Sequence, residues 1–252
     1  MPTRSPPTSL GGRSIDTLSP MDVLQPEDGA KKSEVAADTR SAERVEAAAL
    51  RLFAVHGFEA TGIRQIAQEA GLSVASLYHY MGSKEDLLDR LMRASMEHLL
   101  VPAADILQST PDPRERIVRL VDLHVQKHAK ERLLSVVADT ELRSLSPARR
   151  LELVAMRDEY EAMWQETIAE GVREGYFRVA DVKMAVVAVL EMCTGVAHWY
   201  SPAGRLTLDE ISRAFVDMTV SLLAGPADRR AASDGKPRRH GVGARTSKGV
   251  RR

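Results

Sequence analysis

The sequence predicts an all-α fold, and three observations lead to this prediction. Apolar residues recur at spacings of three and four through most of the region between residues 45 and 223. Serine, threonine or aspartate, the residues that cap helices, precede most of these apolar runs. Runs of valine, isoleucine and threonine bounded by turns, which strands require, do not occur. We therefore expect an N-terminal three-helix domain followed by a C-terminal helical bundle.

Each expected helix has a start or an end that the sequence marks. The first ends at Gly57 and has its apolar face at Val45, Ala48, Ala49, Leu52 and Phe53. Capping side chains mark later helix starts at Ser83, Asp112, Ser146, Asp181 and Thr207. Proline follows two of these caps directly, as is typical of a first helical position. The helices from positions 83, 181 and 207 are expected to end near residues 100, 199 and 223.

Composition limits the classes of protein to which the chain can belong. Its 252 residues are 44% hydrophobic and 28% charged, enough for one large or two smaller folded domains. The single cysteine, Cys193, excludes a disulfide framework and a cysteine-based zinc site, and it indicates a cytoplasmic protein. We expect no secretory signal and no membrane partner, because no apolar run approaches the ~20 residues that span a bilayer.

The two ends of the chain, residues 1–38 and 225–252, predict disordered tails. They are rich in proline, glycine and serine and lack periodic apolar residues. The C-terminal tail carries nine basic residues and two acidic ones, whereas the whole chain has 35 of each sign. Such a tail either binds DNA phosphates without sequence preference or only keeps the protein soluble. Two domains, 39–100 and 101–224, are expected between the tails.

Residues 61–80 follow the pattern of a helix-turn-helix. A helix over 61–70 and a second over 74–80 meet at Gly71, which permits the left-handed backbone of a tight turn. Ser73 is placed to cap the second helix. In DNA-binding proteins with this unit, the second helix enters the major groove.

The outward face of the second helix suits a DNA groove. With Leu77 facing the core, Ala75, Tyr78 and His79 point away from it at about 100° per residue. Ala75 is suited to a thymine methyl group, and Ser76 or His79 to a base edge or a phosphate. Further expected DNA contacts, mostly to phosphate, are Thr61, Arg64, Ser73, Tyr78, Tyr80 and Lys84. Short helices with a glycine turn also occur in ordinary helical proteins, and this domain has no excess of basic residues, so spacing alone leaves that alternative open.

Three segments carry a resemblance to a known family: Ala-Thr-Gly-Ile-Arg-Gln-Ile-Ala at 60–67, Ala-Gly-Leu-Ser-Val-Ala-Ser-Leu-Tyr-His-Tyr at 70–80 and Ser-Lys-Glu-Asp-Leu at 83–87. Together they resemble the DNA-binding domain of the TetR family of bacterial transcriptional regulators over roughly residues 41–90. The resemblance implies a homodimer that binds a palindromic double-stranded DNA operator and releases it when a small effector enters the C-terminal domain. It places DNA contacts at Arg64, Val74, Ala75, Ser76, Tyr78, His79, Tyr80 and Lys84. Gly62 departs from the family pattern, in which a second hydroxyl residue commonly follows Thr61.

The C-terminal half predicts a domain for ligand binding and dimerisation. The helix from Asp181 is apolar nearly all round and the last helix broadly so, which favours a four-helix bundle with a second copy. Glu191, a lone carboxylate in the most apolar helix, either pairs with a hidden cation or faces a ligand. Soft and aromatic side chains are candidates for an effector pocket, although such residues more often fill cores. They are Leu123, Met156, Tyr160, Met163, Trp164, Met184, Met192, Trp199 and Tyr200.

Glu-Gly-Tyr-Phe-Arg at 174–178 and His-Trp-Tyr-Ser-Pro-Ala-Gly-Arg-Leu-Thr at 198–207 carry a second, narrower resemblance. They are similar to the C-terminal domain of TetR-family repressors that sense acyl-CoA thioesters, including repressors of steroid degradation in actinobacteria. This resemblance implies a small hydrophobic effector, acyl-CoA or steroid-CoA, in an elongated apolar cavity, with Arg178, His198 and Arg205 as candidates for the CoA phosphates. The alternative is a regulator of an efflux pump or another pathway that responds to a non-CoA hydrophobic ligand.

Other classes of function are less well supported. His124 and His128 share one helix face at the spacing of zinc ligands, but the sequence does not identify a third ligand, and the alternative is a pair of partly exposed surface histidines. Cys193 and His198 point about 140° apart at 100° per residue, which argues against a nucleophile–base pair. We expect no enzyme activity, metal or cofactor. A pure protein-interaction module leaves the outward face of the second helix unexplained.

The expected mechanism is a shift between two conformations. Dimerisation places two recognition helices about one DNA turn, ~34 Å, apart. An effector in the bundle favours a conformation in which the helix from Ser83 tilts and the recognition helices separate. Operator affinity then falls by the difference in the effector's affinity for the two conformations, typically ~1–3 kcal/mol.

Overall fold

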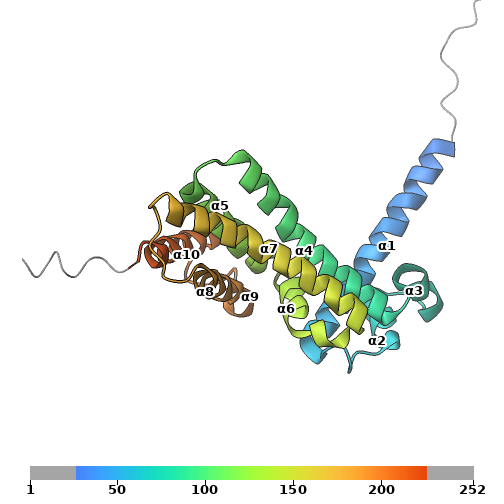
Figure 1. Ribbon diagram of the computed structural model, residues 1–252. Helices are drawn as coiled ribbons and strands as arrows, with labels where there is room; N and C mark the ends of the chain where they lie inside the picture. The colour runs from blue at the N-terminus through green and yellow to red at the C-terminus, as the bar shows by residue number, and fades with distance from the viewer. Residues whose placement is uncertain (1–26, 226–252) are drawn as a thin grey trace, which may run out of the picture. The chain divides into compact units, whose positions relative to one another are not determined.

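The computed structural model describes residues 27–225, with side chains described from residue 37 onward. The chain divides into two units, residues 1–41 and 42–252. Every regular element between residues 27 and 225 is a helix, which confirms the predicted fold class (Figure 1). These elements are α1 (Glu27–His56), α2 (Ile63–Ala70), α3 (Val74–Met81), α4 (Lys84–Ser109), α5 (Pro113–Lys130), α6 (Arg132–Thr140), the 3₁₀ turn η1 (Leu142–Ser144), α7 (Pro147–Arg173), α8 (Val182–Thr194), α9 (Val196–Trp199) and α10 (Leu208–Leu223).

The first helix starts earlier than the sequence predicts. α1 begins at Glu27, ahead of the predicted boundary at residue 39. Residues 27–38 have no apolar stripe, but much of this segment is alanine, glutamate and lysine, which favour helix without any packing partner. The remaining parts of the two predicted tails, residues 1–26 and 226–252, lie outside the described residues.

The part of α1 after residue 41 packs with α2 and α3 into a three-helix domain. Val45, Ala48 and Ala49 are fully buried on the face of α1 that the sequence predicts. The rings of Phe53 and Phe58 lie 5.3 Å apart in a tilted arrangement, just before and just after the end of α1. This core gives α2 and α3 a fixed support.

α4 belongs to both the N-terminal domain and the C-terminal bundle. Its capping box is present: the Ser83 hydroxyl accepts the N–H of Asp86 at 3.0 Å, and the Asp86 carboxylate accepts the N–H of Ser83 at 2.9 Å. The helix runs to Ser109, past the expected end near residue 100, with Pro102 inside it. Proline lacks an N–H and removes a helical hydrogen bond, but buried residues continue to Ile106, so packing holds the last turns together.

The C-terminal bundle forms where α4, α5 and α7 pack against one another, with α10 against α5 (Figure 1). Large side chains that are completely buried, among them Leu120, Trp164 and Ile168, fill its centre. Predicted caps are found here too, except at Ser146, whose side chain forms no cap hydrogen bond. The Asp112 carboxylate accepts the N–H of Arg114 at 2.8 Å, and the Asp181 carboxylate accepts the N–H of Met184 at 3.1 Å.

The apolar segment after Asp181 is two helices instead of the expected one. α8 and α9 are separated at Gly195, a residue with low helix propensity. By length and composition alone, Val182–Trp199 is apolar enough to cross a membrane, the one such stretch in the part of the chain that the structure describes. This is weak support for a membrane span, because a core helix passes the same test, and Val186 and Val189 are fully buried among the other helices.

Candidate DNA interface and effector cavity

The turn between α2 and α3 has the geometry that the sequence predicts. Gly71 ends α2 in the left-handed region, with φ 67° and ψ 37°. The N–H of Leu72 donates to the carbonyl of Ala67 at 2.9 Å and closes the turn. The Ser73 hydroxyl then accepts the N–H of Ser76 at 3.0 Å and caps α3. These local bonds set the direction in which α3 leaves the turn.

α3 presents one face to the core and the other to solvent. Leu77 and Met81 are buried, and Ala75, Ser76, Tyr78 and His79 are exposed, as the sequence predicts. Tyr78 leaves 52% of its surface exposed, and its hydroxyl bonds to no residue that the structure describes. Val74, which the family resemblance places among the DNA contacts, is also exposed. The outward face of α3 is therefore available to a macromolecular partner.

Two predicted phosphate contacts are engaged inside the domain. The hydroxyl of Thr61 is buried and donates to the Gly57 carbonyl at 2.8 Å. The ammonium of Lys84 donates to the carbonyls of Phe58 and Thr61, at 2.7 and 2.9 Å, and lies 4.1 Å from the centre of the Phe58 ring. Both side chains thus hold the loop between α1 and α2, a role that differs from the predicted one. The sequence around Lys84 does not indicate that its ammonium bonds to carbonyl groups so far back along the chain.

Other predicted contacts lie at the edge of the outward face of α3. Arg64, on α2, is exposed and forms no hydrogen bond or ion pair with any described residue. Tyr80 is half-buried and packs against the core, and its carbonyl accepts a hydrogen bond from Arg90 at 3.1 Å. Arg64 is therefore available to a phosphate, whereas Tyr80 offers only part of its ring.

A cavity of about 480 Å³, open to solvent where exposed residues line it, lies among the helices of the C-terminal bundle. Residues from several helices line it: Met96 and Leu99 of α4, His124 and His128 of α5, Asp139 of α6, Arg157, Tyr160 and Glu161 of α7, Leu190, Glu191 and Thr194 of α8, Gly195 between α8 and α9, and His198 of α9. The volume lies in the range of small-molecule sites. Because α4 forms part of the wall, a molecule in the cavity touches the helix that begins in the DNA-binding domain.

Two stacked histidines dominate the deep side of this cavity. The ring centres of His124 and His128 are 4.0 Å apart, and both side chains are buried. His124 lies 3.2 Å from the Tyr160 hydroxyl through Nδ1 and 3.0 Å from the Thr194 hydroxyl through Nε2. Burial lowers the pKa of both imidazoles, that of His124 well below its usual value, so the pair is neutral at neutral pH.

Two family models match the chain. Residues 47–91 match the model described as bacterial regulatory proteins, tetR family, and residues 110–223 match the tetracyclin repressor-like C-terminal domain. A curated relative, the HTH-type transcriptional repressor KstR2 of Mycobacterium tuberculosis, is 30% identical over 181 residues, 71% of this chain and 90% of the relative. The chain belongs to the TetR family of transcriptional regulators.

Solved structures of other TetR-family regulators share the fold. The structure of the ketosteroid transcriptional regulator KstR2 of Mycobacterium tuberculosis matches with a TM-score of 0.68 and 28% identity, over 72% of this chain and 94% of that one. AibR in complex with isovaleryl coenzyme A and operator DNA matches with a TM-score of 0.63 and 25% identity, over 71% and 97%. These likenesses confirm the helix-turn-helix domain followed by a helical ligand-binding domain.

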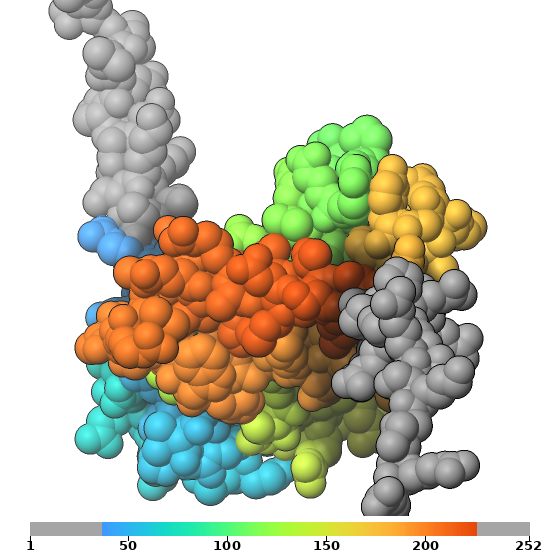
Figure 2. Space-filling view, turned by 90° about the vertical axis from the view of Figure 1, so that its left-hand side faces the viewer, coloured from blue at the N-terminus to red at the C-terminus, as the bar shows by residue number. Residues whose placement is uncertain are grey.

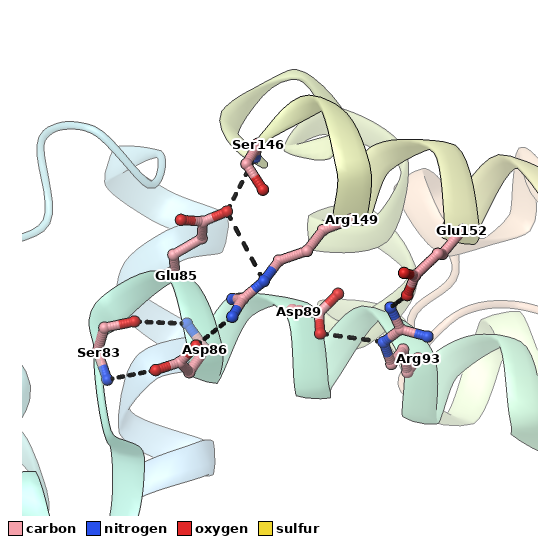
Figure 3. A network of polar contacts seen from close by, with 8 residues as sticks. All are labelled: Ser83, Glu85, Asp86, Asp89, Arg93, Ser146, Arg149 and Glu152. Carbon is pink, nitrogen blue, oxygen red and sulfur yellow. Dashed lines mark hydrogen bonds and ion pairs between the residues drawn. The ribbon is translucent and has the colours of Figure 1, made fainter.

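In this TetR-family chain, an ionic network joins the first turns of α4 and α7 (Figure 3). Arg149 forms an ion pair with Asp86, and its Nε lies 3.9 Å from the carboxylate of Glu85. The backbone N–H of Ser146 donates to Glu85 at 2.9 Å. Hydrogen bonds from Arg149 to Asp86, and from Ser146 to Glu85, lower the pKa of both carboxyl groups, so both are charged at neutral pH.

A second arginine extends this network along α4 (Figure 3). Arg93 donates to Asp89 of its own helix at 3.0 Å and pairs with Glu152 of α7. Both α4 and α7 also line the cavity, at Met96 and Tyr160 for example. On α4, Met96 lies twelve residues after Lys84, roughly 18 Å along the helix. The network therefore links the start of α4 to α7, a helix that a molecule in the cavity contacts.

The predicted effector residues do not all meet at one place. Tyr160, Glu191 and His198 line the cavity. Trp199, Tyr200 and Arg205 line a separate hollow of about 230 Å³, and Leu123 a groove of about 780 Å³ between α5 and α10. Met184 is exposed. The remaining candidates pack in or beside the core, and they are Met156, Met163, Trp164 and Met192. Their roles as effector contacts stay predictions.

Sequence reasoning missed several residues of the cavity wall. The interpretation of His124 and His128 as surface histidines is wrong, because they are 3% and 7% exposed. They continue the buried stripe of α5 that begins with Ile117 and Leu120, and this periodicity was available as a signal. Asp139 and Arg157 gave no such signal. Among residues 37–225, no three His, Cys, Asp or Glu side chains are grouped to hold a metal ion.

Proposed function

We propose that the protein is a cytoplasmic, homodimeric repressor that binds a palindromic DNA operator through α3. The observation that carries this proposal is the exposed face of α3, which shows small, hydroxyl, aromatic and imidazole groups to solvent. These groups suit base edges, thymine methyl groups and phosphates in a major groove. The repressor function named for KstR2 supports repression as the outcome of binding.

The variant Tyr78→Ala tests the DNA-binding part of this proposal. We expect it to lose affinity for DNA that the full-length protein selects from a random pool, with an unchanged unfolding temperature and an unchanged oligomeric state. Tyr176→Ala is the matched control, because Tyr176 is also exposed and lies after α7, outside the helix-turn-helix. Equal DNA affinity in Tyr78→Ala and the original protein would refute α3 as the reading helix.

Exposed apolar side chains on α8 and α10 support a dimer. Met184 and Val187 of α8, and Met218 and Leu222 of α10, are between 37% and 61% exposed. Figure 2 shows α8 to α10, the orange segments, side by side on one face of the molecule. A helix that is apolar on its outer side needs a further partner, and a second copy supplies the same surface in return. We therefore place the two-fold axis at this face.

Introducing a charge at the exposed apolar face of α8 and α10 tests whether two copies pair there. Met218→Asp is expected to convert the dimer into monomers in analytical ultracentrifugation, because the carboxylate would be buried against a second copy. Val101→Asp is the control, since Val101 is 62% exposed on α4, away from α8 and α10. A dimer that survives Met218→Asp would place the interface elsewhere.

The effector site is proposed to be the cavity of about 480 Å³. A ligand pressing on the wall formed by Met96 and Leu99 favours a different position of α4, and the network at Asp86 and Arg149 passes that change to the domain that holds α3. Operator affinity falls by the ligand's difference in affinity for the two positions.

Two classes of effector are expected from the sequence: an acyl-CoA or steroid-CoA thioester, and a non-CoA hydrophobic ligand. The isovaleryl coenzyme A bound to AibR supports an acyl thioester. The cavity itself favours the alternative, a non-CoA ligand with an apolar part. Three carboxylates line it against one arginine, and of the three candidates for CoA phosphates only His198 is on its wall. Native mass spectrometry of the protein purified from its own host decides between them: a co-purified thioester contradicts the non-CoA ligand.

A further inference from the structure

The polar wall of the cavity has more carboxylates than permanent cations. Arg157, the permanent cation of the wall, already donates to the Ala138 carbonyl at 2.6 Å and lies 4.0 Å from a carboxylate oxygen of Asp139. Glu161 accepts a hydrogen bond from Gln165 at 2.8 Å. Glu191 is exposed at the cavity and forms no hydrogen bond or ion pair with any residue in the described part of the chain. Three carboxylates therefore line the wall together with one permanent cation.

The buried histidine His128 adds a further acceptor. Its Nδ1 lies 2.9 Å from the carbonyl oxygen of His124, and since a carbonyl only accepts, Nδ1 carries the proton. The neutral ring then has a lone pair on Nε2, and that atom bonds to no residue between 37 and 225. The side chain is 93% buried and lines the cavity, so this lone pair has no partner within the described part of the protein and can accept a hydrogen bond from a molecule in the cavity.

The surroundings of Asp139 supply too little positive charge for its carboxylate. About a third of its side chain, 34%, is accessible, and the residue lines the cavity. Burial raises the pKa of its carboxyl, although Arg157 and two histidines act in the opposite direction. The Arg157 guanidinium, at 4.0 Å, is thus too distant to compensate fully for the loss of water around the carboxylate.

We propose that the effector carries a protonated amine that binds between Asp139 and Glu191, with its apolar part against Met96, Leu99 and Leu190. This inference rests on the proposed function, because it takes the cavity as the effector site. An ammonium group supplies three donors and a positive charge, which matches a wall with net negative charge and with acceptors at Glu191 and His128 that have no partner in the described part of the protein. A phosphate or a free carboxylate has the opposite charge and offers further acceptors.

Isothermal titration of the full-length protein with four octyl compounds tests the inference. The probes are octylamine, 1-octanol, octanoate and octanoyl-CoA, which share one apolar chain and differ in the polar end. We expect octylamine to bind about tenfold more tightly than 1-octanol, equal to ~1.4 kcal/mol, and the two anionic probes to bind more weakly than the alcohol. Equal affinity for amine and alcohol, or tightest binding of octanoyl-CoA, would overturn the proposal.

Two variants locate the amine. Glu191→Gln should reduce the preference for octylamine over 1-octanol several-fold, and the matched control Glu159→Gln, an exposed carboxylate of α7 outside the cavity, should not. Because the readout is a ratio within each variant, a change in folding affects both probes alike. The same preference in Glu191→Gln as in the control refutes the placement. These titrations contain no DNA and test only the effector. A failure to bind DNA or to dimerise is measured in the separate experiments above, and it would contradict the proposed function and not the amine.

Discussion

Replacing Lys84 by methionine tests whether this lysine is a structural clamp or a phosphate contact. Its ammonium makes two charge-assisted hydrogen bonds, to the carbonyls of Phe58 and Thr61, and lies over the Phe58 ring. Each such bond adds ~1.5 kcal/mol in a half-exposed position, and the ring contact at most ~1 kcal/mol. The carbonyl of Phe58 keeps a bond from the N–H of Thr61 at 3.2 Å, which limits the loss. We expect Lys84→Met to lower the free energy of unfolding by about 2 to 3 kcal/mol.

Two measurements separate the clamp from the phosphate contact. Urea unfolding at a fixed protein concentration gives the loss of stability, with Lys130→Met as the control, because Lys130 is exposed and lacks a described partner. The salt dependence of DNA binding gives the number of phosphate contacts, since each contributes a slope of about 0.9. A clamp predicts lower stability and an unchanged slope. Unchanged stability with a slope shallower by about one would refute the clamp and confirm the phosphate contact.

Three further perturbations follow from the structure. Burial lowers the pKa of both stacked histidines below ~6.5, the pKa of histidine in the unfolded chain. Below that pH the unfolded chain therefore binds more protons than the folded protein. Stability should fall on acidification from pH ~7 to ~5.5, by up to ~1.4 kcal/mol per pH unit for each histidine, and a double asparagine variant should show a shallower slope in urea unfolding. Gly171→Ala places a Cβ 2.1 Å from the ring of Phe177 and should lower the unfolding free energy by ~1–3 kcal/mol; an unchanged melting temperature contradicts this. Arg149→Gln should speed amide exchange in the first turn of α4, at Ser83 and after, whereas the exposed Arg150→Gln should leave that exchange unchanged.

The sequence by itself determined the helices and the helix-turn-helix, because their signals are local. The caps at Ser73, Ser83 and Thr207 join atoms only three residues apart, so a short segment specifies each bond. The turn at Gly71 depends on one backbone conformation that glycine favours. The inward position of Leu77 follows from helical periodicity alone. Even here, local rules missed the start of α1, where helix forms without an apolar stripe.

Tertiary structure alone decided which side chains meet. Lys84 reaches carbonyls 23 and 26 residues away, and Arg149 pairs with a carboxylate 63 residues away. The cavity gathers residues from Met96 to His198, and no spacing along the chain relates them. Spacing places the two histidines of α5 on the same face as Ile117 and Leu120, but it does not show which side chains of α7 and α8 they meet. Bonds within one helical turn are encoded by adjacent residues, whereas the cavity wall depends on how helices pack, and many distant residues determine that together.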